Sequence, residues 1–354
     1  MPNKDIKPTK QLEEKQLNAC NELLTQQVTT AWEEISGLKI PATYKNVANI
    51  VFVGMGGSSL GGHLFQSVYR GQLKVPFELV RDYTLPNYVN SKSLVILSSF
   101  SGSTEEVLAA ALEAKKRHAK ILGIASGGKL VSLMKKEKWP GYIFDPGDLA
   151  PQPRMGLGFS LVGVIGLLKK VGLIKVTAQD IEALKTAMNE VIDCSAADVG
   201  LNNNPAKKVA NSLAGKPLLI IAAEHLVGNA HVIQNQINET AKQFAVYAEL
   251  PELNHHLLEG LTFPKELFKK FGVLVLRSGL YSKKMSQRFE VTADLLESQG
   301  ATVVEYEAGG GSKLEECGEL LQFGAYVASY LAMVNKVDPL AIPWVDELKK
   351  RMIK

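Results

Sequence analysis

The sequence has few cysteines and no long apolar run, and each shortage excludes a class of protein. Its three cysteines, Cys20, Cys194 and Cys317, lie far apart and form no CxxC pair. Neither a disulfide framework nor a zinc–thiolate site is therefore expected. The longest mostly apolar stretch, residues 159–173, reaches paired lysines after about ten residues, short of the ~20 that cross a bilayer. The sequence thus predicts no membrane partner.

The net charge is also small. The 354 residues carry 40 Lys and Arg against 36 Asp and Glu, a balance of +4. Such a balance is too mild to indicate a nucleic-acid partner, so we expect a small-molecule ligand. Residues 1–16 are polar and have no apolar core of the kind that secretory signals carry, so a cytoplasmic location is expected.

Short apolar runs alternate with helical patterns in the first half of the chain. A segment at 10–37 has helical spacing of apolar residues and ends at a glycine. The buried-strand pattern recurs at 49–54, 76–80, 93–100, 120–125 and 142–146. Helical segments separate these runs at 60–70, 104–118, 129–137 and 157–171. This alternation is typical of an α/β domain with a parallel sheet.

The same pattern begins again in the second half. Strands are predicted at 216–224, 245–250, 272–277 and 302–308, with helices at 177–193, 232–243, 283–299 and 313–334. The length and this repetition predict two α/β lobes. We place an N-terminal helical segment at 1–40, a first domain at 41–175, a helical connection at 176–205 and a second domain at 206–354.

A glycine-rich turn follows the first predicted strand. Its residues are Gly54, Gly56, Gly57, Gly61 and Gly62 around Ser58 and Ser59. Glycines let a backbone approach a ligand closely, and the start of the next helix attracts an anion such as phosphate. A P-loop would need a lysine here, and a dinucleotide fingerprint would need a third glycine at Ser59. Asp82 lies near where a ribose-binding acid is expected, so a nicotinamide-dependent oxidoreductase remains an alternative.

A second hydroxyl-rich turn follows the strand at 93–100. Ser99, Ser101, Ser103 and Thr104 surround Gly102, ahead of an acidic helix start. One of these hydroxyls would suffice as a helix cap, and the others exceed that need. Because the carboxyl ends of neighbouring parallel strands meet at one edge, the two turns together predict a phosphate site built from hydroxyls and backbone N–H groups.

These residues resemble a known family. GMGGSSLGG at 54–62 and SSFSGSTEE at 98–106 are similar to the two signature motifs of sugar isomerase (SIS) domains. Further similarity extends in order along the chain to the bifunctional phosphoglucose/phosphomannose isomerases. It is carried by RDYTLP at 81–86, PQPR at 151–154, NQINETAK at 235–242, ELPELNHH at 249–256 and DELKK at 346–350.

The resemblance implies a fold, an assembly and an activity. It implies two SIS-type lobes, each a parallel sheet flanked by helices in an α-β-α sandwich, and a homodimer. The implied reaction interconverts glucose 6-phosphate, and also mannose 6-phosphate, with fructose 6-phosphate through a cis-enediol. Neither a metal nor another cofactor is implied.

The resemblance also implies roles for individual residues. Arg154 would stabilise the enediolate, Glu239 would be the base, and His255 and Lys349 would serve ring opening, with Lys350 as the alternative lysine. The phosphate would be held by Gly56, Gly57, Ser58, Ser99, Ser101 and Thr104. The chain departs from the family pattern at Ser59, Leu60, His63 and Ser103, which affects loop detail more than the donors.

The residues themselves leave simpler interpretations open. Glu239 suits a base once its pKa is raised, but it is equally compatible with a solvated helix acid paired with Lys242 or Gln243. Arg154 offers a fixed positive fork amid prolines, or a loop ion pair. His255 and His256 are predicted in a loop after a strand, where an imidazole can exchange protons near pH 7. His225 and His231 are interpreted as structural.

Two other classes remain alternatives. A non-catalytic sugar-phosphate-binding regulator would carry a DNA-binding helix-turn-helix, for which the residues before 49 offer little. An amino-sugar-phosphate isomerase would use related chemistry but a different set of basic groups.

Overall fold

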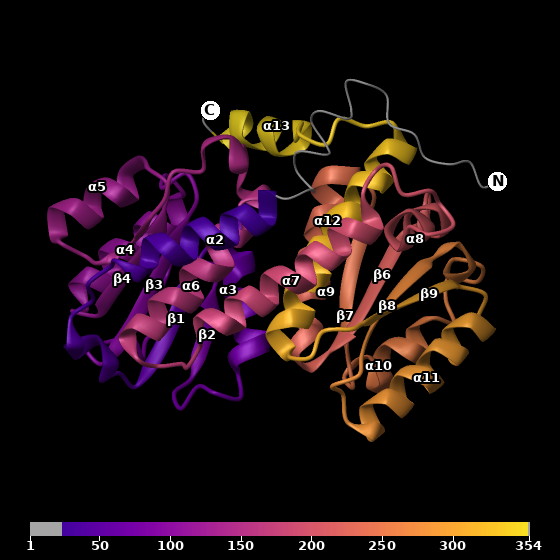
Figure 1. Cartoon of the computed structure of the whole chain (residues 1–354), viewed down its shortest axis with the longest axis horizontal. Coiled ribbons are helices and arrows are strands. Elements are labelled where there is room, and N and C mark those ends of the chain that lie inside the picture. Colours follow the sequence, from indigo (N-terminus) through magenta and orange to yellow (C-terminus); the bar gives the residue numbers. More distant parts are fainter. Residues whose placement is uncertain (1–22, 353–354) are drawn as a thin grey trace.

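A computed structural model describes residues 23–352, which form two α/β lobes lying side by side (Figure 1). The helix expected over 10–37 is described only from Leu23 onwards, as α2 (Leu23–Ser36), and its earlier part lies outside the described residues. The predicted fold class, two parallel sheets flanked by helices, is confirmed.

The first lobe is built on a five-stranded parallel sheet in the order β2-β1-β3-β4-β5. The strands are β1 (Asn49–Val53), β2 (Phe77–Val80), β3 (Ser93–Ser99), β4 (Lys120–Ala125) and β5 (Gly141–Ile143). Successive residues of β1 enter different cores, Ile50 and Phe52 on one face and Val51 and Val53 on the other. Both faces of the sheet are therefore covered, which is why its strands are nearly continuous apolar runs.

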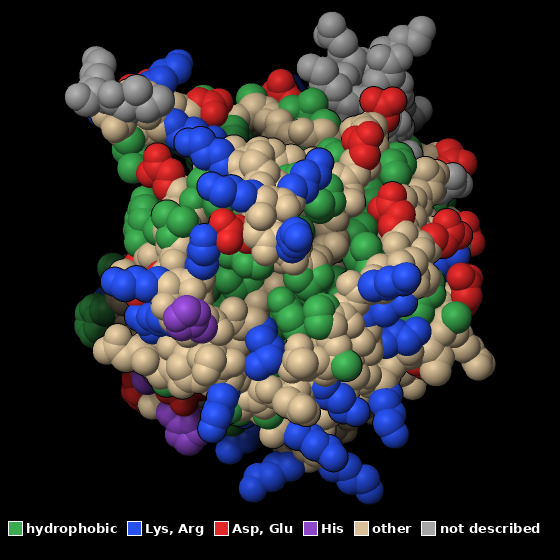
Figure 2. All heavy atoms as spheres, turned by 90° about the vertical axis from the view of Figure 1, so that its left-hand side faces the viewer, with side chains coloured by type: hydrophobic (Ala, Val, Ile, Leu, Met, Phe, Trp, Pro, Cys, Tyr) green, Lys and Arg blue, Asp and Glu red, His purple; other side chains and the backbone are tan. Residues whose placement is uncertain are grey.

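Helices cover the two faces of this sheet unequally. The outer face carries α4 (Glu105–Lys116) and α5 (Gly128–Glu137), whose apolar residues pack with Val51 and Val53. The inner face carries α2, α3 (Gly57–Tyr69) and α6 (Leu157–Val171), which share a core with the second lobe. Lys and Arg side chains are spread over the outer side of this lobe (Figure 2).

The second lobe has a four-stranded parallel sheet in the order β7-β6-β8-β9. Its strands are β6 (Leu218–Ala223), β7 (Ala245–Leu250), β8 (Gly272–Ser278) and β9 (Thr302–Ala308). Its helices are α8 (Pro205–Leu213), α9 (Val227–Gln236), α10 (Leu253–Gly260), α11 (Lys283–Ser298) and α12 (Lys313–Asn335). The helix α7 (Ala178–Ser195) leads from the first lobe and packs along α12, and α13 (Pro343–Met352) follows the second lobe.

The two lobes meet through α3 and α9. A Cβ on Gly228 would lie 2.7 Å from the carbonyl oxygen of His63, so the glycine permits the close approach of the two helices. The Gly228 N–H donates to Ser67 Oγ at 2.9 Å. One continuous apolar core runs through both helices and α12, so the lobes are packed as one unit.

Three segments differ from the sequence-based expectation. His255 and His256 lie in the helix α10, not in a loop, because helical backbone resumes directly after Pro251. The helix expected at 232–243 begins earlier, at Val227, and its last turn is a π-helix over Ile237–Ala241. The helix α8 begins directly after the polar segment that ends at Asn204, where no helix is predicted. Asn204 caps it by accepting a hydrogen bond from the Lys207 N–H.

None of the described helices is long and apolar enough to cross a membrane.

Two largely buried histidines at the contact between the lobes predict a loss of stability in acid. The rings of His63 and His231 meet edge to face with centroids 4.1 Å apart. Burial, aided by the positive charge of Arg81, lowers the pKa of His63 to about 3 and that of His231 to about 4. Both imidazoles therefore stay neutral in the folded chain at a pH where they are protonated in the unfolded chain.

The stabilising effect of these neutral rings is complete above their unfolded pKa of about 6.5 and is lost as the pH falls below it. We expect the free energy of unfolding to drop by about 2 kcal/mol for each ring between about pH 7.5 and about pH 5. Urea unfolding at the two pH values measures this drop. In a variant with both His63→Gln and His231→Gln, the free energy of unfolding should change much less with pH, whereas the His118→Gln variant, at an exposed position, should keep the wild-type dependence on pH. The same pH dependence in the wild type and both variants would contradict the role given to the two buried histidines.

Candidate active site

The first glycine-rich turn joins β1 to α3 and touches the segment that carries Arg154. Gly56 has a φ of +48°, a conformation that side chains rarely adopt. A Cβ on Gly57 would lie 2.7 Å from the Pro153 carbonyl carbon and 2.8 Å from the Arg154 nitrogen. Glycine is thus required at position 57 for the turn to lie against the backbone of Arg154.

Ser58 fastens the first turn to the second. Its Oγ accepts the Phe100 N–H at 2.9 Å, and its carbonyl oxygen accepts the Ser98 hydroxyl at 2.8 Å. The structure therefore brings the two turns together at the carboxyl ends of β1 and β3, as the sequence predicted.

In the second turn two of the hydroxyls face each other. Ser99 Oγ and Thr104 Oγ1 lie 2.8 Å apart, and Ser101 Oγ accepts the Ser103 N–H at 3.3 Å. Gly102 has a φ of +66°, and a Cβ there would collide with the carbonyl oxygen of Gly127. The turn is therefore held against the loop that precedes α5.

Neither α3 nor α4 is capped by a side chain. The N-cap residues are Gly56 and Thr104, and the Thr104 hydroxyl makes no capping hydrogen bond. The first N–H groups of a helix lack partners inside the helix and carry positive potential. Two uncapped helix starts beside a set of hydroxyls form a site suited to phosphate.

Arg154 lies beside this site, in a single 3-10 turn (Pro153–Met155). It is 4% exposed, and its Nη2 donates to the carbonyl oxygens of Pro339 at 2.7 Å and Leu340 at 3.0 Å. Nη1 donates to the Gln152 side chain and lies 3.5 Å from Glu239 Oε2. Burial lowers the pKa of Arg154, and the carboxylates of Glu239 and Asp338 oppose that shift. The guanidinium is thus fixed from several sides.

Glu239 reaches Arg154 from the second lobe. It lies in the π-helical turn that ends α9, a form of helix often found at functional sites. Its side chain is 32% exposed. Burial raises the pKa of Glu239, against the opposing effect of Arg154 and Lys242. A partly buried carboxylate with a raised pKa, beside a fixed cation, can accept and return a proton.

The simpler pairings considered for Glu239 are not seen. The Gln243 amide donates to the carbonyl oxygens of Leu213 and Lys216 at 2.9 and 2.8 Å, away from Glu239. The Lys242 amine donates to the backbone carbonyl of Glu239 and not to its carboxylate. Burial lowers the pKa of Lys242, and Arg154 adds to that effect. From the sequence, Lys242 is expected only as a possible ion-pair partner of Glu239 on the surface, whereas in the structure it lies beside Glu239 and Arg154.

His255 is not brought to the Arg154–Glu239 pair within one chain. Glu239 precedes the start of β7, whereas His255 lies beyond its end, so about 17 Å of strand separates the two ends. His255 is exposed on α10. Lys349 and Lys350 are both exposed on α13, whose Trp344 is 84% exposed.

The other two singled-out histidines have polar or aromatic partners in the interior. His225 Nε2 lies 2.6 Å from Glu316 Oε2, and His231 contacts His63. Within residues 23–352, no group of His, Cys, Asp and Glu side chains is arranged to hold a metal ion.

Comparison with known proteins identifies the class of domain from which this chain is built. Residues 43–132 match the model of the SIS domain, and residues 202–352 match that of the bacterial phospho-glucose isomerase C-terminal SIS domain. The fold also resembles solved structures. A hypothetical protein from Thermus thermophilus aligns with a TM-score of 0.73 at 16% identity, covering 97% of this chain and 94% of that one. The C-terminal domain of glucosamine-fructose-6-phosphate aminotransferase from Francisella tularensis gives 0.65 at 13% identity, covering 90% and 96%. The protein is thus built from two SIS domains.

Curated relatives narrow the class to a family. The bifunctional phosphoglucose/phosphomannose isomerase of Caldicellulosiruptor bescii is 32% identical over 93% of this chain and 96% of that relative. The enzyme of the same name from Thermoplasma acidophilum is 30% identical over 86% and 90%. A D-glucosamine-6-phosphate 4-epimerase from Sulfolobus acidocaldarius is 27% identical over 64% and 68%. The chain belongs to the bifunctional phosphoglucose/phosphomannose isomerase family and is an isomerase, as the sequence motifs predicted.

Proposed function

We propose that this protein interconverts glucose 6-phosphate and mannose 6-phosphate with fructose 6-phosphate. The observation that carries the proposal is the pair formed by Arg154 and Glu239, 3.5 Å apart, with the Arg154 backbone directly against Gly57 of the glycine-rich turn. The family relationship supports the same substrates.

The residues divide the reaction between them. The phosphate is bound at the first turn by the backbone N–H groups of Gly56 and Gly57, and by the hydroxyls of the second turn. The Ser58 N–H donates to the Met55 carbonyl oxygen at 3.0 Å, so Ser58 contributes by holding the first turn against the second. Glu239 takes the proton from C2 of the open-chain aldose and returns it to C1, through a cis-enediol. The Arg154 guanidinium stabilises the negative oxygen that develops in between. These steps use only groups of the chain and need no cofactor.

Either epimer at C2 gives the same planar enediol once its C2 proton is removed. One carboxylate that reaches both carbons therefore serves both aldoses, provided that the C2 hydroxyl is loosely held. This argument supports the dual specificity that the family relationship suggests.

A coupled assay tests the proposal directly. Fructose 6-phosphate formation is measured from glucose 6-phosphate and, separately, from mannose 6-phosphate, with EDTA present. Turnover of both aldoses supports the proposal. Inactivity on both would overturn it in favour of a non-catalytic regulator or of amino-sugar-phosphate chemistry, which the Sulfolobus relative makes the nearest rival. The cytoplasmic location stays a prediction for cell fractionation.

The phosphate site makes its own prediction. Replacing Ser101 and Thr104 by Ala removes two hydroxyls but no charge, so we expect KM to rise about tenfold for one or two lost hydrogen bonds to phosphate, while kcat changes little. Steady-state kinetics with glucose 6-phosphate measure both constants. Ser91→Ala, on the exposed loop before β3, is the matched control. An unchanged KM in the double variant would show that the phosphate binds elsewhere.

We further propose that the protein is a homodimer in which His255 acts in the site of the other copy. The separation of His255 from Glu239 along β7 supports this arrangement, because one chain cannot close that gap. Imidazole suits ring opening because it both donates and accepts a proton near pH 7.

Mixing two inactive variants tests this arrangement. Glu239→Gln and His255→Asn are each expected to lose most activity, and co-refolding them is expected to restore up to about a quarter of the wild-type activity, through heterodimers holding one intact site. Activity is measured per chain after mixing, and the molecular mass by light scattering. A mixture that stays inactive while dimers form would contradict action across the interface.

A further inference from the structure

A second pocket lies between the lobes, away from the Arg154–Glu239 pair. Its volume is about 700 Å³. Its walls come from the end of α3 (Tyr69 to Gln72), the start of α12 (Ser312 and Lys313) and the segment after β6 (Glu224 and His225). Because α3 begins at the candidate active site and ends at this pocket, the length of its 13 residues separates the two by about 20 Å.

The two lobes share an order of strands and helices, and in that order the pocket corresponds to the candidate active site. β1 and β6 occupy equivalent places in the two sheets, and the helix after each, α3 and α9, packs against the other lobe. The candidate site combines the start of α3, the segment before α6 and the end of α9. The pocket combines the segment that leads into α9, the start of α12 and the end of α3.

The backbone supports the correspondence. Glu224, the first residue after β6, has a φ of +49°, and Gly56, the third residue after β1, has a φ of +48°. The two turns therefore share a residue of positive φ, although their side chains differ. The second lobe has no hydroxyl-rich turn at this place, so the chemistry of its pocket is different.

That chemistry is cationic. Arg70, Lys175 and Lys313 all line the pocket and are exposed. Among the residues that the structure describes, no carboxylate lies within ion-pair distance of any of the three. The lining also holds two acids, Asp180, which is engaged by the capping box at the start of α7, and the exposed Glu224, so its cations outnumber its acids by three to two. Three unpaired cations around one hollow attract a small polyanion.

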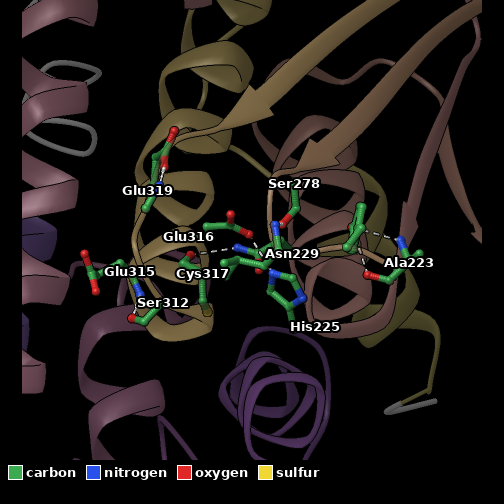
Figure 3. A network of polar contacts seen from close by, with 12 residues as sticks. Ala223, His225, Asn229, Ser278, Ser312, Glu315, Glu316, Cys317 and Glu319 are labelled. Carbon is green, nitrogen blue, oxygen red and sulfur yellow. Dashed lines mark hydrogen bonds and ion pairs between the residues drawn. The ribbon is translucent and has the colours of Figure 1, made fainter. Parts of the chain in front are cut away.

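A buried imidazole adds a polar wall. The side chain of His225 is fully buried, and its Nε2 lies 2.6 Å from Glu316 on α12 (Figure 3). Its Nδ1 has no hydrogen-bond partner among the described residues, and His225 is one of the residues that line the pocket. Buried polar atoms are almost always paired, so an unpaired nitrogen at a pocket wall indicates a missing hydrogen-bond partner.

We propose that this pocket is a second binding site, for a small compound that carries two anionic groups, at least one of them a phosphate. The three cations bind the anionic groups, and the Ser67 and Ser312 hydroxyls lie in the wall between them. The volume matches that of a small-molecule site. The proposal rests on this pocket and not on the isomerase activity, so it can fail while that activity stands.

The first test measures the Kd of inorganic pyrophosphate for the whole protein by titration calorimetry at low salt. Arg70→Gln combined with Lys313→Gln is expected to weaken binding at least tenfold, because two charged contacts are lost. Lys135→Gln combined with Lys136→Gln, on the exposed face of α5, is the matched control for charge and should bind as the wild type does. Ser101→Ala combined with Thr104→Ala, in the candidate active site, should also leave this Kd unchanged.

The second test locates the bound anion. Acetylation of lysines by acetic anhydride, read by mass spectrometry, is expected to slow several-fold at Lys175 and Lys313 when pyrophosphate is present, and not at Lys135. The proposal would be overturned if the Arg70/Lys313 and Lys135/Lys136 variants weakened binding equally, or if only the Ser101/Thr104 variant lost binding. It would also be overturned if pyrophosphate protected all these lysines equally from acetylation, or if no binding were detected at millimolar pyrophosphate.

Discussion

Replacing Glu239 by Gln is expected to lower kcat by a factor of about 10²–10⁴, the range that a positioned general base contributes. Glutamine keeps the size and a hydrogen-bonding oxygen but cannot accept the C2 proton. The backbone N–H groups and hydroxyls that we propose to bind phosphate belong to the first lobe, so the substitution leaves them in place. The variant should therefore still bind fructose 6-phosphate with nearly the wild-type Kd.

Turnover from the coupled assay and Kd from calorimetry separate these two effects. Glu182→Gln is a suitable control, because that acid is exposed on α7 and its ion pair with Lys185 is a surface one. The control should retain full activity. If Glu239→Gln kept most of its turnover, another group would have to be the base; if it lost ligand binding as well, its effect would be structural.

The meeting of the two turns that form the proposed phosphate site was predictable from the sequence because each turn is local. Each turn directly follows an apolar strand, and parallel strands present their carboxyl ends at one edge, so the residues around Ser58 and Ser101 had to meet once the sheet was recognised. The excess of hydroxyls over the needs of capping was a physical signal as well. In the structure the Thr104 hydroxyl indeed caps nothing and faces Ser99.

The pairing of Arg154 with Glu239 was not predictable from the residues alone, because it joins two lobes through helix packing. Nothing in the sequence near Glu239 indicates that α9 ends in a π-helical turn, or that Pro339 and Leu340 return to bind the guanidinium. Arg154 was a candidate from the residues alone, as a fixed positive fork amid prolines, whereas only the family resemblance singled out Glu239. The helical placement of His255 was missed for a related reason, since a short helix after a proline has too little periodicity to be recognised.

Two substitutions of Arg154 distinguish the effect of its positive charge from the effect of its planar shape. Arg154→Lys keeps the charge but loses the planar fork that binds the carbonyl oxygens of Pro339 and Leu340. Arg154→Met loses both. We expect kcat to fall by a factor of about 10²–10³ in each variant, because the developing enediolate loses a fixed donor.

The pH dependence distinguishes the two variants. Glu239 acts as a base only when it is deprotonated, and the positive charge of Arg154 opposes the rise that burial causes in its pKa. Removing the charge in Arg154→Met should raise that pKa further, so the acid limb of the kcat/KM profile moves to higher pH. Arg154→Lys should leave the limb near its wild-type position. A limb that does not move in Arg154→Met would mean that the titrating group is not Glu239, and that the ion pair across the lobes only holds the structure together.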